Sequence, residues 1–278
     1  MSAYDSSAKV IRRGSFQAAT AAVSAAYDKR SACYGTHVAT YRDPALTLIM
    51  LEGLRLALAL KVLDLGAGQG DGAAHLRAVG ADVISADVSE VMLRQGLERG
   101  TVQGGGAIRC DMRHSPLPFQ SKSFDLVVLR YAAHDVQDKG LLLAEIRRVM
   151  IPGGRVQLVD MSVRDREALA FYNQLHAAKT VGDPVPCWIL SPAEYRQLLK
   201  EAGFTVESEL WYQSRVSSLD WLAEEQITEA RHDELLRFVR LSFSSHPLLR
   251  KIFNARVRLK SFWIEFPVVC LTAQYRKR

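Results

Sequence analysis

The stretch Val62-Leu63-Asp64-Leu65-Gly66-Ala67-Gly68-Gln69-Gly70 joins an apolar run to an acid and to three glycines at every second position. The apolar run predicts a buried parallel strand that ends in a tight turn. Glycines let the backbone of such a turn approach a ligand closely. Residues 71–79 predict a helix whose first N–H groups face the same point. The stretch therefore predicts an α/β fold with a ligand site at the end of this strand.

Two ligand classes fit such a unit, and the spacing of the glycines separates them. A dinucleotide fingerprint has the form G-x-G-x-x-G, with its third glycine where the pyrophosphate lies against the helix. Here Asp71 occupies that third place, and its carboxylate would repel a diphosphate. The third glycine is Gly70, and Asp64 before the turn suits a cationic ligand better. An NAD(P)-dependent oxidoreductase is thus disfavoured, and a glycine-rich turn without a ligand is the simpler alternative.

The acid followed by G-x-G-x-G resembles motif I of the class I S-adenosylmethionine-dependent methyltransferases. In that family the acid and the glycines hold the amino-acid end and the sulfonium region of the cofactor. The resemblance implies S-adenosylmethionine as the cofactor of this chain. It places these residues in contact with it: Asp64, Gly66, Ala67, Gly68 and Gly70.

The second predicted strand, residues 81–86, ends at Asp87, twenty-one residues after Gly66. An acid at this distance is expected to bind a ribose hydroxyl, although a lone Asp can also cap the next helix. Ser89 predicts the N-cap of a helix that runs to about Glu98. Met92, on its first turn, is placed to pack on an adenine or to join the core.

The third and fourth predicted strands end in further polar segments. Residues 107–110 lead into Asp111-Met112, and in the resembled family this acid accepts from the adenine amino group while the next residue offers its backbone N–H. A simple loop role for Asp111 is the alternative. Residues 123–129 open on to Arg130-Tyr131-Ala132-Ala133-His134-Asp135-Val136, which looks like the R-x-A-A-H-H segment of the ubiquinone/menaquinone C-methyltransferase-like branch. Asp135 replaces the second His of that segment.

Three more residues complete the cofactor contacts that the resemblance implies: Val88, Arg130 and Tyr34. The chemistry is an in-line displacement, in which a nucleophile attacks the methyl carbon and the sulfonium leaves as a neutral sulfide. His134 is the candidate general base, because it follows the fourth strand and titrates near neutrality. A role in shaping the pocket is the alternative for His134, and Asp160 and His176 are the other candidate bases.

The order of the predicted elements indicates a Rossmann-like fold with a seven-stranded, mostly parallel sheet and an antiparallel last strand. A helix over residues 191–202, with Ser191 as its N-cap, precedes a sixth strand at residues 205–212, and the last strand lies near residues 266–275. We expect a core of residues 58–213 and 264–278. Residues 214–263 are predicted to form a helical insertion, broken near His246-Pro247.

Residues 1–57 are expected to form a separate helical segment. Tyr27, Tyr34 and Tyr41 recur every seven residues, which fits one stripe of a helix packed on the core. Members of the resembled family often use such a segment, with a tyrosine, to close over cofactor and substrate. The segment is therefore predicted to be either a lid or an ordinary packed helix.

Composition sets outer bounds on these interpretations. The chain has 278 residues, of which 48% are hydrophobic, so it can bury a full core. No apolar run reaches the ~18 residues of a membrane span, and the cysteines are scattered, so we expect a cytoplasmic protein without a metal site. Residues 229–278 hold eleven Lys or Arg against four acids. Such a surface attracts an anionic partner, or it is simply a solvated helix face.

The acceptor is expected to be a small apolar or aromatic molecule methylated on carbon or oxygen. The prediction depends on aromatic residues after the fifth strand that could line a pocket: Trp188, Tyr212, Trp221, Phe262 and Trp263. A nucleic-acid methyltransferase is one alternative, but the segment Arg130-Tyr131-Ala132-Ala133 is not the [DNS]-P-P-[YFW] motif of amino-methylating enzymes. A cofactor-binding protein without activity is the other. The assembly state stays open.

Overall fold

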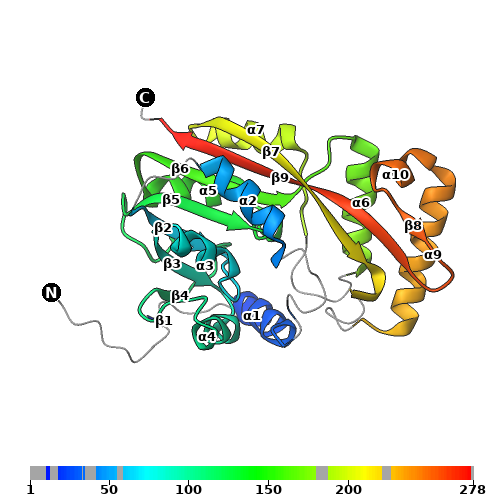
Figure 1. The fold of residues 1–278 in the computed structure, drawn as a ribbon, viewed down its shortest axis with the longest axis horizontal. Coiled ribbons are helices and arrows are strands. Elements are labelled where there is room, and N and C mark those ends of the chain that lie inside the picture. Colours follow the sequence, from blue (N-terminus) through cyan, green and yellow to red (C-terminus); the bar gives the residue numbers. More distant parts are fainter. Residues whose placement is uncertain are drawn as a thin grey trace.

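The computed structural model of the chain describes residues 11–12, 18–32, 34, 42–54, 59–179, 187–220 and 227–276. Within these residues one sheet of nine strands forms the centre of the molecule (Figure 1). The strands are β1 (Ile11–Arg12), β2 (Lys61–Leu65), β3 (Asp82–Asp87), β4 (Ala107–Arg109), β5 (Phe124–Arg130), β6 (Met150–Met161), β7 (Phe204–Ser217), β8 (Arg256–Val257) and β9 (Phe262–Tyr275). The α-helices are α1 (Ala18–Arg30), α2 (Pro44–Leu54), α3 (Asp71–Ala78), α4 (Glu90–Glu98), α5 (Lys139–Val149), α6 (Arg166–Lys179), α7 (Pro192–Glu201), α9 (Glu229–Ser245) and α10 (Pro247–Ile252).

The strand order confirms the predicted fold class. The sheet runs β1-β4-β3-β2-β5-β6-β9-β7, with β8 paired to β9 at the side. The pairs from β4 to β6 are all parallel, whereas β9 is antiparallel to both of its neighbours. Seven strands match the expected sheet, and the two-residue strands β1 and β8 add to it. Because parallel strands end at the same edge, the segments after β2, β3, β4 and β5 meet there.

Helices cover both faces of this sheet, and the central strand β5 shows why. Leu126 and Val128 point to a core that includes residues of α2 and α3, whereas Val127 and Leu129 point to a core that includes residues of α5 and α7. All four are at most 2% exposed. Alternate residues of a strand face opposite sides, so a continuous apolar run fits a strand that is buried on both faces.

The caps predicted from the sequence are present. Ser89 caps α4 by accepting from the Met92 N–H at 3.1 Å. Ser191 and Glu194 form a capping box at the start of α7, with Pro192 in its first turn. Among the described residues, no helix has the length and apolarity needed to cross a bilayer.

The ladder of β7 and β9 extends past the rest of the sheet. Pairing of β6 with β9 ends at Met161 and Val268, but β9 continues beside β7 from Pro267 back to Trp263. The strand β7 therefore runs beyond the predicted end of the sixth strand. Because β6 ends there, the extra length projects from the carboxyl edge of the parallel strands. The helices α9 and α10 pack there against α6, at the right of Figure 1.

Phe171 of α6 is the centre of that packing. Its ring lies 5.6 Å from the Phe238 ring, 5.3 Å from the Phe243 ring and 5.3 Å from the Phe253 ring, measured between centroids. The helix pair breaks at His246 and Pro247, as predicted, because α9 ends at Ser245 and α10 begins at Pro247. The division of the chain into segments 1–57, 214–263 and a core stays a prediction.

Candidate functional site

A cleft opens at the carboxyl ends of β2, β3, β4 and β5. It has an empty volume of about 560 Å³, including space open to solvent. Its lining is mostly apolar, with polar atoms at a few places, which is typical of small-molecule sites. The lining residues are Val23, Tyr27, Tyr34, Leu65, Gly66, Gly68, Asp87, Val88, Met92, Cys110, Asp111, Met112, Arg113, Tyr131, Ala132 and Asp135.

The three positions after β2 need glycine for different structural reasons. A Cβ on Gly66 would lie 2.5 Å from the Ala132 Cβ, and one on Gly70 would lie 2.5 Å from Val102 Cγ2. These two glycines allow the loop to pack on the protein itself. At Gly68 the nearest atom would be Met92 Sδ, at 3.6 Å. Gly68 is therefore the glycine whose missing side chain leaves room in the cleft for a ligand.

Asp87 fastens this loop from the end of β3. Its Oδ2 accepts from the Gly68 N–H at 2.7 Å, and its Oδ1 accepts from the Ser89 N–H at 2.8 Å. Burial raises the pKa of Asp87 to about 6, although the backbone donors oppose this rise. A carboxylate has further lone pairs, so Asp87 can still accept from hydroxyl groups of a ligand in the cleft.

Asp64 lies below the loop and does not line the cleft. It is 2% exposed, and burial raises its pKa to about 6 in spite of the nearby Arg130 guanidinium. A backbone N–H of Ala73 also bonds to this carboxyl, while Oδ2 has no hydrogen-bond partner in the described structure. A buried acceptor without a donor is costly, and a cationic group would satisfy it.

Asp111 and Met112, the predicted adenine contacts, follow β4 and line the cleft. Arg113, which the sequence analysis missed, also lines it and donates to Asp111 Oδ1 through Nε at 2.8 Å. Burial alone would raise the pKa of Asp111, but the bonds from Arg113 outweigh it and lower the pKa. Asp111 is therefore held ionised with its acceptor oxygens at the cleft.

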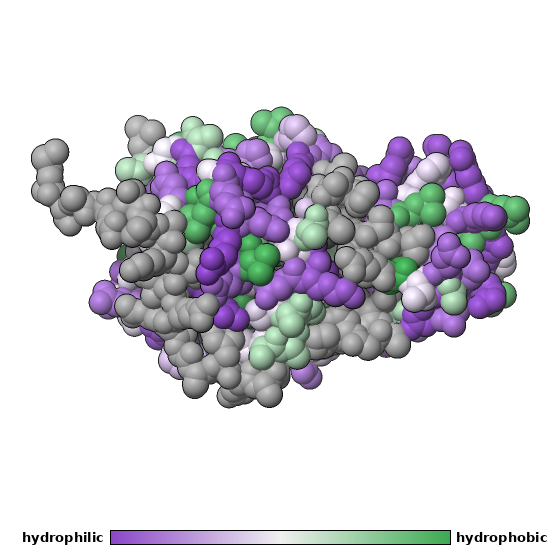
Figure 2. All heavy atoms as spheres, turned by 90° about the horizontal axis from the view of Figure 1, so that it is seen from below, coloured by the Kyte–Doolittle hydropathy of each residue, from purple (hydrophilic) through white to green (hydrophobic). Residues whose placement is uncertain are grey.

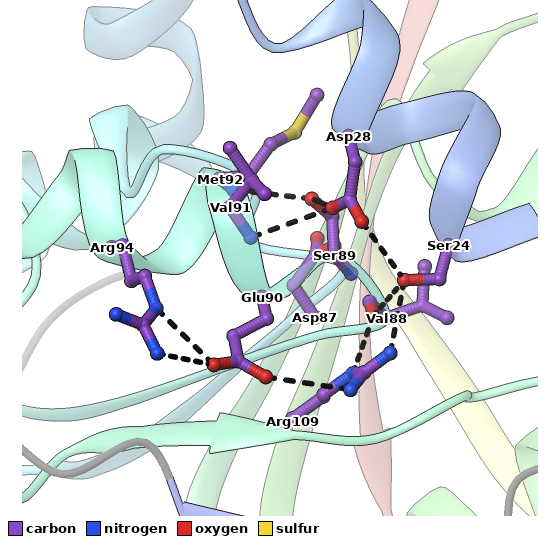
Figure 3. A network of polar contacts seen from close by, with 10 residues as sticks. All are labelled: Ser24, Asp28, Asp87, Val88, Ser89, Glu90, Val91, Met92, Arg94 and Arg109. Atoms are coloured by element: carbon purple, nitrogen blue, oxygen red, sulfur yellow. Dashed lines mark hydrogen bonds and ion pairs between the residues drawn. The ribbon is translucent and has the colours of Figure 1, made fainter. Parts of the chain in front are cut away.

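Helix α1 is fastened along one side of the cleft by a polar network (Figure 3). Asp28 Oδ1 accepts from Ser89 Oγ at 2.5 Å at the start of α4, and Ser24 Oγ donates to the Val88 carbonyl at 3.2 Å. Arg109 of β4 donates to Ser24 Oγ at 3.1 Å and pairs with Glu90 at 3.4 Å. These contacts fix α1 beside the end of β3.

The same face of α1 reaches the other side of the cleft. Tyr27 lies three residues after Ser24 and one before Asp28, so the three share a face of the helix. The Tyr27 hydroxyl donates to Asp135 Oδ2, which lies after β5. Helix α1 thus joins the segment after β3 to the segment after β5 and lies across the cleft.

His134 is held between two carboxylates beside the cleft. Its Nδ1 lies 2.7 Å from Asp160 Oδ1, and its Nε2 lies 3.4 Å from Asp135 Oδ1. Its backbone N–H also donates to Asp160 Oδ2, at 2.9 Å. Asp160, at the end of β6, is completely buried, so it orients the imidazole from behind.

The charge of His134 follows from these neighbours. Burial lowers the pKa of the imidazole, but Asp160 and Asp135 outweigh burial and raise it to about 8. Near neutral pH the ring is therefore an imidazolium, and it accepts a proton only after it has lost one. His134 itself does not line the cleft, whereas Asp135 does.

The structure separates the other predicted site residues. Tyr34, Gly66, Gly68, Asp87, Val88, Met92, Asp111 and Met112 line the cleft, while Asp64, Ala67, Gly70, Arg130 and His134 lie behind or beside it. His176 is buried in α6 against the Tyr172 ring, with centroids 4.9 Å apart. Tyr27, Arg113 and Asp135 were missed as site residues, although Tyr27 had a sequence signal in the seven-residue spacing of tyrosines and Asp135 in its place in the R-x-A-A-H-H segment.

The described residues do not bring the predicted aromatic side chains together at the cleft. Trp188, Tyr212, Phe262 and Trp263 are all absent from the lining of the cleft. Phe262 is fully buried, and the next residue of β9, Trp263, lines a separate hollow. Neighbours on a strand face opposite sides, so the two rings cannot share one wall. Trp221, Tyr41 and residues 180–186 lie outside the described residues.

Comparison with known proteins gives consistent results. Residues 63–158 match the methyltransferase-domain family. A demethylmenaquinone methyltransferase of Clavibacter sepedonicus is 33% identical over 146 residues, which are 50% of this chain and 58% of that protein. The ubiquinone/menaquinone biosynthesis C-methyltransferase of Burkholderia vietnamiensis is 38% identical over 109 residues, 37% of this chain and 43% of that protein. The chain thus spans little more than half of these relatives at most.

Solved structures agree on the fold. The YcgJ protein of Bacillus subtilis superposes with a TM-score of 0.73 at 20% identity, covering 85% of this chain and 100% of that one. The geranyl diphosphate C-methyltransferase of Streptomyces coelicolor, solved with S-adenosylhomocysteine, gives a TM-score of 0.55 at 17% identity. It covers 84% of this chain and 76% of that one. Identities this low are informative about the fold alone.

Proposed function

We propose that this chain is a class I S-adenosylmethionine-dependent methyltransferase, similar to the ubiquinone/menaquinone C-methyltransferase branch, and that it methylates a small apolar or aromatic molecule on carbon or oxygen. The observation that carries the proposal is the position of α1. This helix bonds to Val88 and Ser89 on one side of the cleft and to Asp135 on the other. A cleft crossed by a helix admits a small molecule more readily than a polymer.

The open space and the hydrogen-bond acceptors at the cleft fit the cofactor. The open space at Gly68, the acceptor oxygens of Asp87 and the unpartnered buried oxygen of Asp64 match a cationic ligand that carries hydroxyl groups. Asp87 would hold its ribose, and Met92, Asp111 and Met112 its adenine, while Asp64, below the loop, would attract its positively charged amino-acid end by charge. When bound, S-adenosylmethionine supplies a methyl group on positively charged sulfur, which leaves as a neutral sulfide.

The residues after β5 and β6 would handle the proton of the acceptor. As the new bond to the methyl carbon forms, the acceptor loses a proton from its hydroxyl or carbon. Asp135 lines the cleft and lies 3.4 Å from His134 Nε2, so the proton can pass to this nitrogen through the carboxylate. Asp160 stabilises the resulting imidazolium. This general-base step requires neutral His134, so turnover should rise as the pH increases through about 8.

A methyl-transfer assay tests the proposal. The protein would be given labelled S-adenosylmethionine with one of three acceptors: reduced demethylmenaquinone, a simple naphthol, or total transfer RNA. We expect label on one of the small molecules and none on RNA. His134→Gln should lower turnover by ~10²–10⁴, the usual contribution of a general base, with unchanged affinity for S-adenosylhomocysteine. Label on RNA alone would contradict the proposal. Full activity of His134→Gln would contradict the role of His134 as the general base.

A further inference from the structure

The far end of the β7–β9 ladder, with the helices α9 and α10, carries an excess of positive charge, although Glu265 and Glu167 of neighbouring elements lie close to it. Residues 237–260, which cover most of α9, all of α10 and β8, and the turn into β9, contain seven Lys or Arg and no Asp or Glu. Five of these cations are exposed at the tip: Arg250, Lys251, Arg256, Arg258 and Lys260. The whole chain has a net charge of +6, so this one region accounts for more than its total.

Large apolar side chains are exposed among these cations. Leu259 is 81% exposed between Arg258 and Lys260, Leu241 of α9 is 69% exposed and Leu248 of α10 is 56% exposed. Figure 2 shows hydrophobic and hydrophilic residues intermixed over this end of the molecule. We call these three leucines and the cations of residues 237–260 the distal basic surface. Leucine among cations is the composition of segments that lie at a membrane interface.

The turn that carries Leu259 is held in place. Arg240 Nη2 donates to the carbonyls of Arg258 and Leu259, at 2.7 and 2.6 Å. The Arg258 guanidinium also lies over the Trp263 ring, 4.7 Å from its centroid. These contacts tie the turn between β8 and β9 to α9. The exposed leucine is therefore presented by a braced turn.

The aromatic residues of the region favour lipid over nucleic acid. A single-stranded nucleic acid is bound by exposed aromatic rings that stack on bases. Here Phe243 and Phe253 are buried, and Phe238 stacks on Phe171 at 5.6 Å. The surface holds leucines, which can enter the headgroup region, cations, which bind anionic headgroups, and several small polar residues.

From these observations we propose that the distal basic surface docks the protein on an anionic lipid bilayer. The part of the β7–β9 ladder beyond the end of β6 projects from the carboxyl edge of the parallel strands. The cleft opens at this same edge. Docking would thus bring the open edge of the sheet toward the bilayer. The inference is independent of the acceptor, because it depends only on charge and exposure.

Vesicle sedimentation tests the proposal. The full chain would be mixed with vesicles of phosphatidylcholine alone or of equimolar phosphatidylcholine and phosphatidylglycerol. We expect it to sediment only with the anionic vesicles, and added salt should release it. Lys251→Glu/Lys260→Glu should weaken vesicle binding by at least twentyfold, at roughly fivefold for each cation lost. Both lysines are exposed and have no side-chain bond in the described structure, so the fold should persist.

Matched variants separate docking from net charge and from surface apolarity. Lys61→Glu/Lys200→Glu makes the same change of charge on exposed residues elsewhere, and it should leave most of the binding intact. Leu259→Asn should weaken binding several-fold, whereas Leu141→Asn, at a leucine of α5 that is 60% exposed, should not. Equal sedimentation with both vesicle types, equal losses in both charge pairs, or binding to single-stranded RNA but not to vesicles would overturn the proposal.

Discussion

The two halves of the cleft are built in different ways. In the half at the ends of β2, β3 and β4, backbone atoms and single acids at strand ends form the site, and each lies close in sequence to the strand that positions it. In the half at the ends of β5 and β6, Tyr27, Asp135, His134 and Asp160 form a chain of contacts between distant segments. The first half is thus local in sequence, and the second depends on tertiary packing.

The two halves also titrate in different ranges. Burial raises the pKa of Asp64 and of Asp87 to about 6. In the other half the two carboxylates raise the pKa of His134 to about 8. Cofactor binding and proton transfer should therefore respond to pH separately, and two of the four predictions below use this difference.

The largest effect is expected at Gly66. The change Gly66→Ala places a Cβ 2.5 Å from Ala132 at a φ of +77°, so we expect a loss of about 3 kcal/mol in the free energy of unfolding. The control is Gly68→Ala, with a φ of +54° but no atom nearer than 3.6 Å. It should cost about 1 kcal/mol of stability and mainly reduce affinity for S-adenosylhomocysteine. Urea denaturation and calorimetry would compare them, and equal stability losses would contradict the assignment.

His134 should link stability to pH in the second half of the cleft. A pKa raised from 6.5 to about 8 means that the folded state binds the proton more tightly than the unfolded state. The stabilisation, about 2 kcal/mol, is complete below pH 6.5 and is lost as the pH rises through about 8. Denaturation of the wild type and of His134→Gln across this range would measure it. A wild type that loses no more stability than the variant would exclude this linkage.

Affinity for the cofactor should depend on pH in the lower range. As the pH falls through about 6, Asp64 and Asp87 take up protons and lose the charge that holds the ligand. At pH 5 a group with a pKa of about 6 is roughly one-tenth ionised, so affinity for S-adenosylhomocysteine should fall about tenfold for one required carboxylate. Calorimetric titrations at pH 5 and pH 7 would show this. Constant affinity would mean that neither carboxylate needs its charge.

The smallest effect is expected at the contact between the halves. Tyr27→Phe removes the hydroxyl that donates to Asp135 and keeps the ring in the cleft. Turnover should fall about fivefold, equivalent to about 1 kcal/mol, because water can replace part of the lost bond. The control is Tyr275→Phe, at the far end of β9. Unchanged kinetics of Tyr27→Phe would remove α1 from the catalytic account.

The sequence predicts the first half of the cleft better than the second. The strand ends, the caps at Ser89 and Ser191 and the placement of Gly68, Asp87 and Met92 in the cleft follow from spacing along the chain. Such features depend on short-range geometry. The pairing of Tyr27 with Asp135 spans 108 positions, and that of His134 with Asp160 spans 26. No local pattern encodes these pairings, nor the position of β9 that leaves both Phe262 and Trp263 outside the cleft.

The central claim is that a methyl donor, rather than a nicotinamide nucleotide, binds at the end of β2. Calorimetric titration of the same protein sample with S-adenosylhomocysteine and with NADPH tests it most directly. We predict saturable binding of S-adenosylhomocysteine and no heat of binding from NADPH. Saturable binding of NADPH with none of S-adenosylhomocysteine would contradict the account.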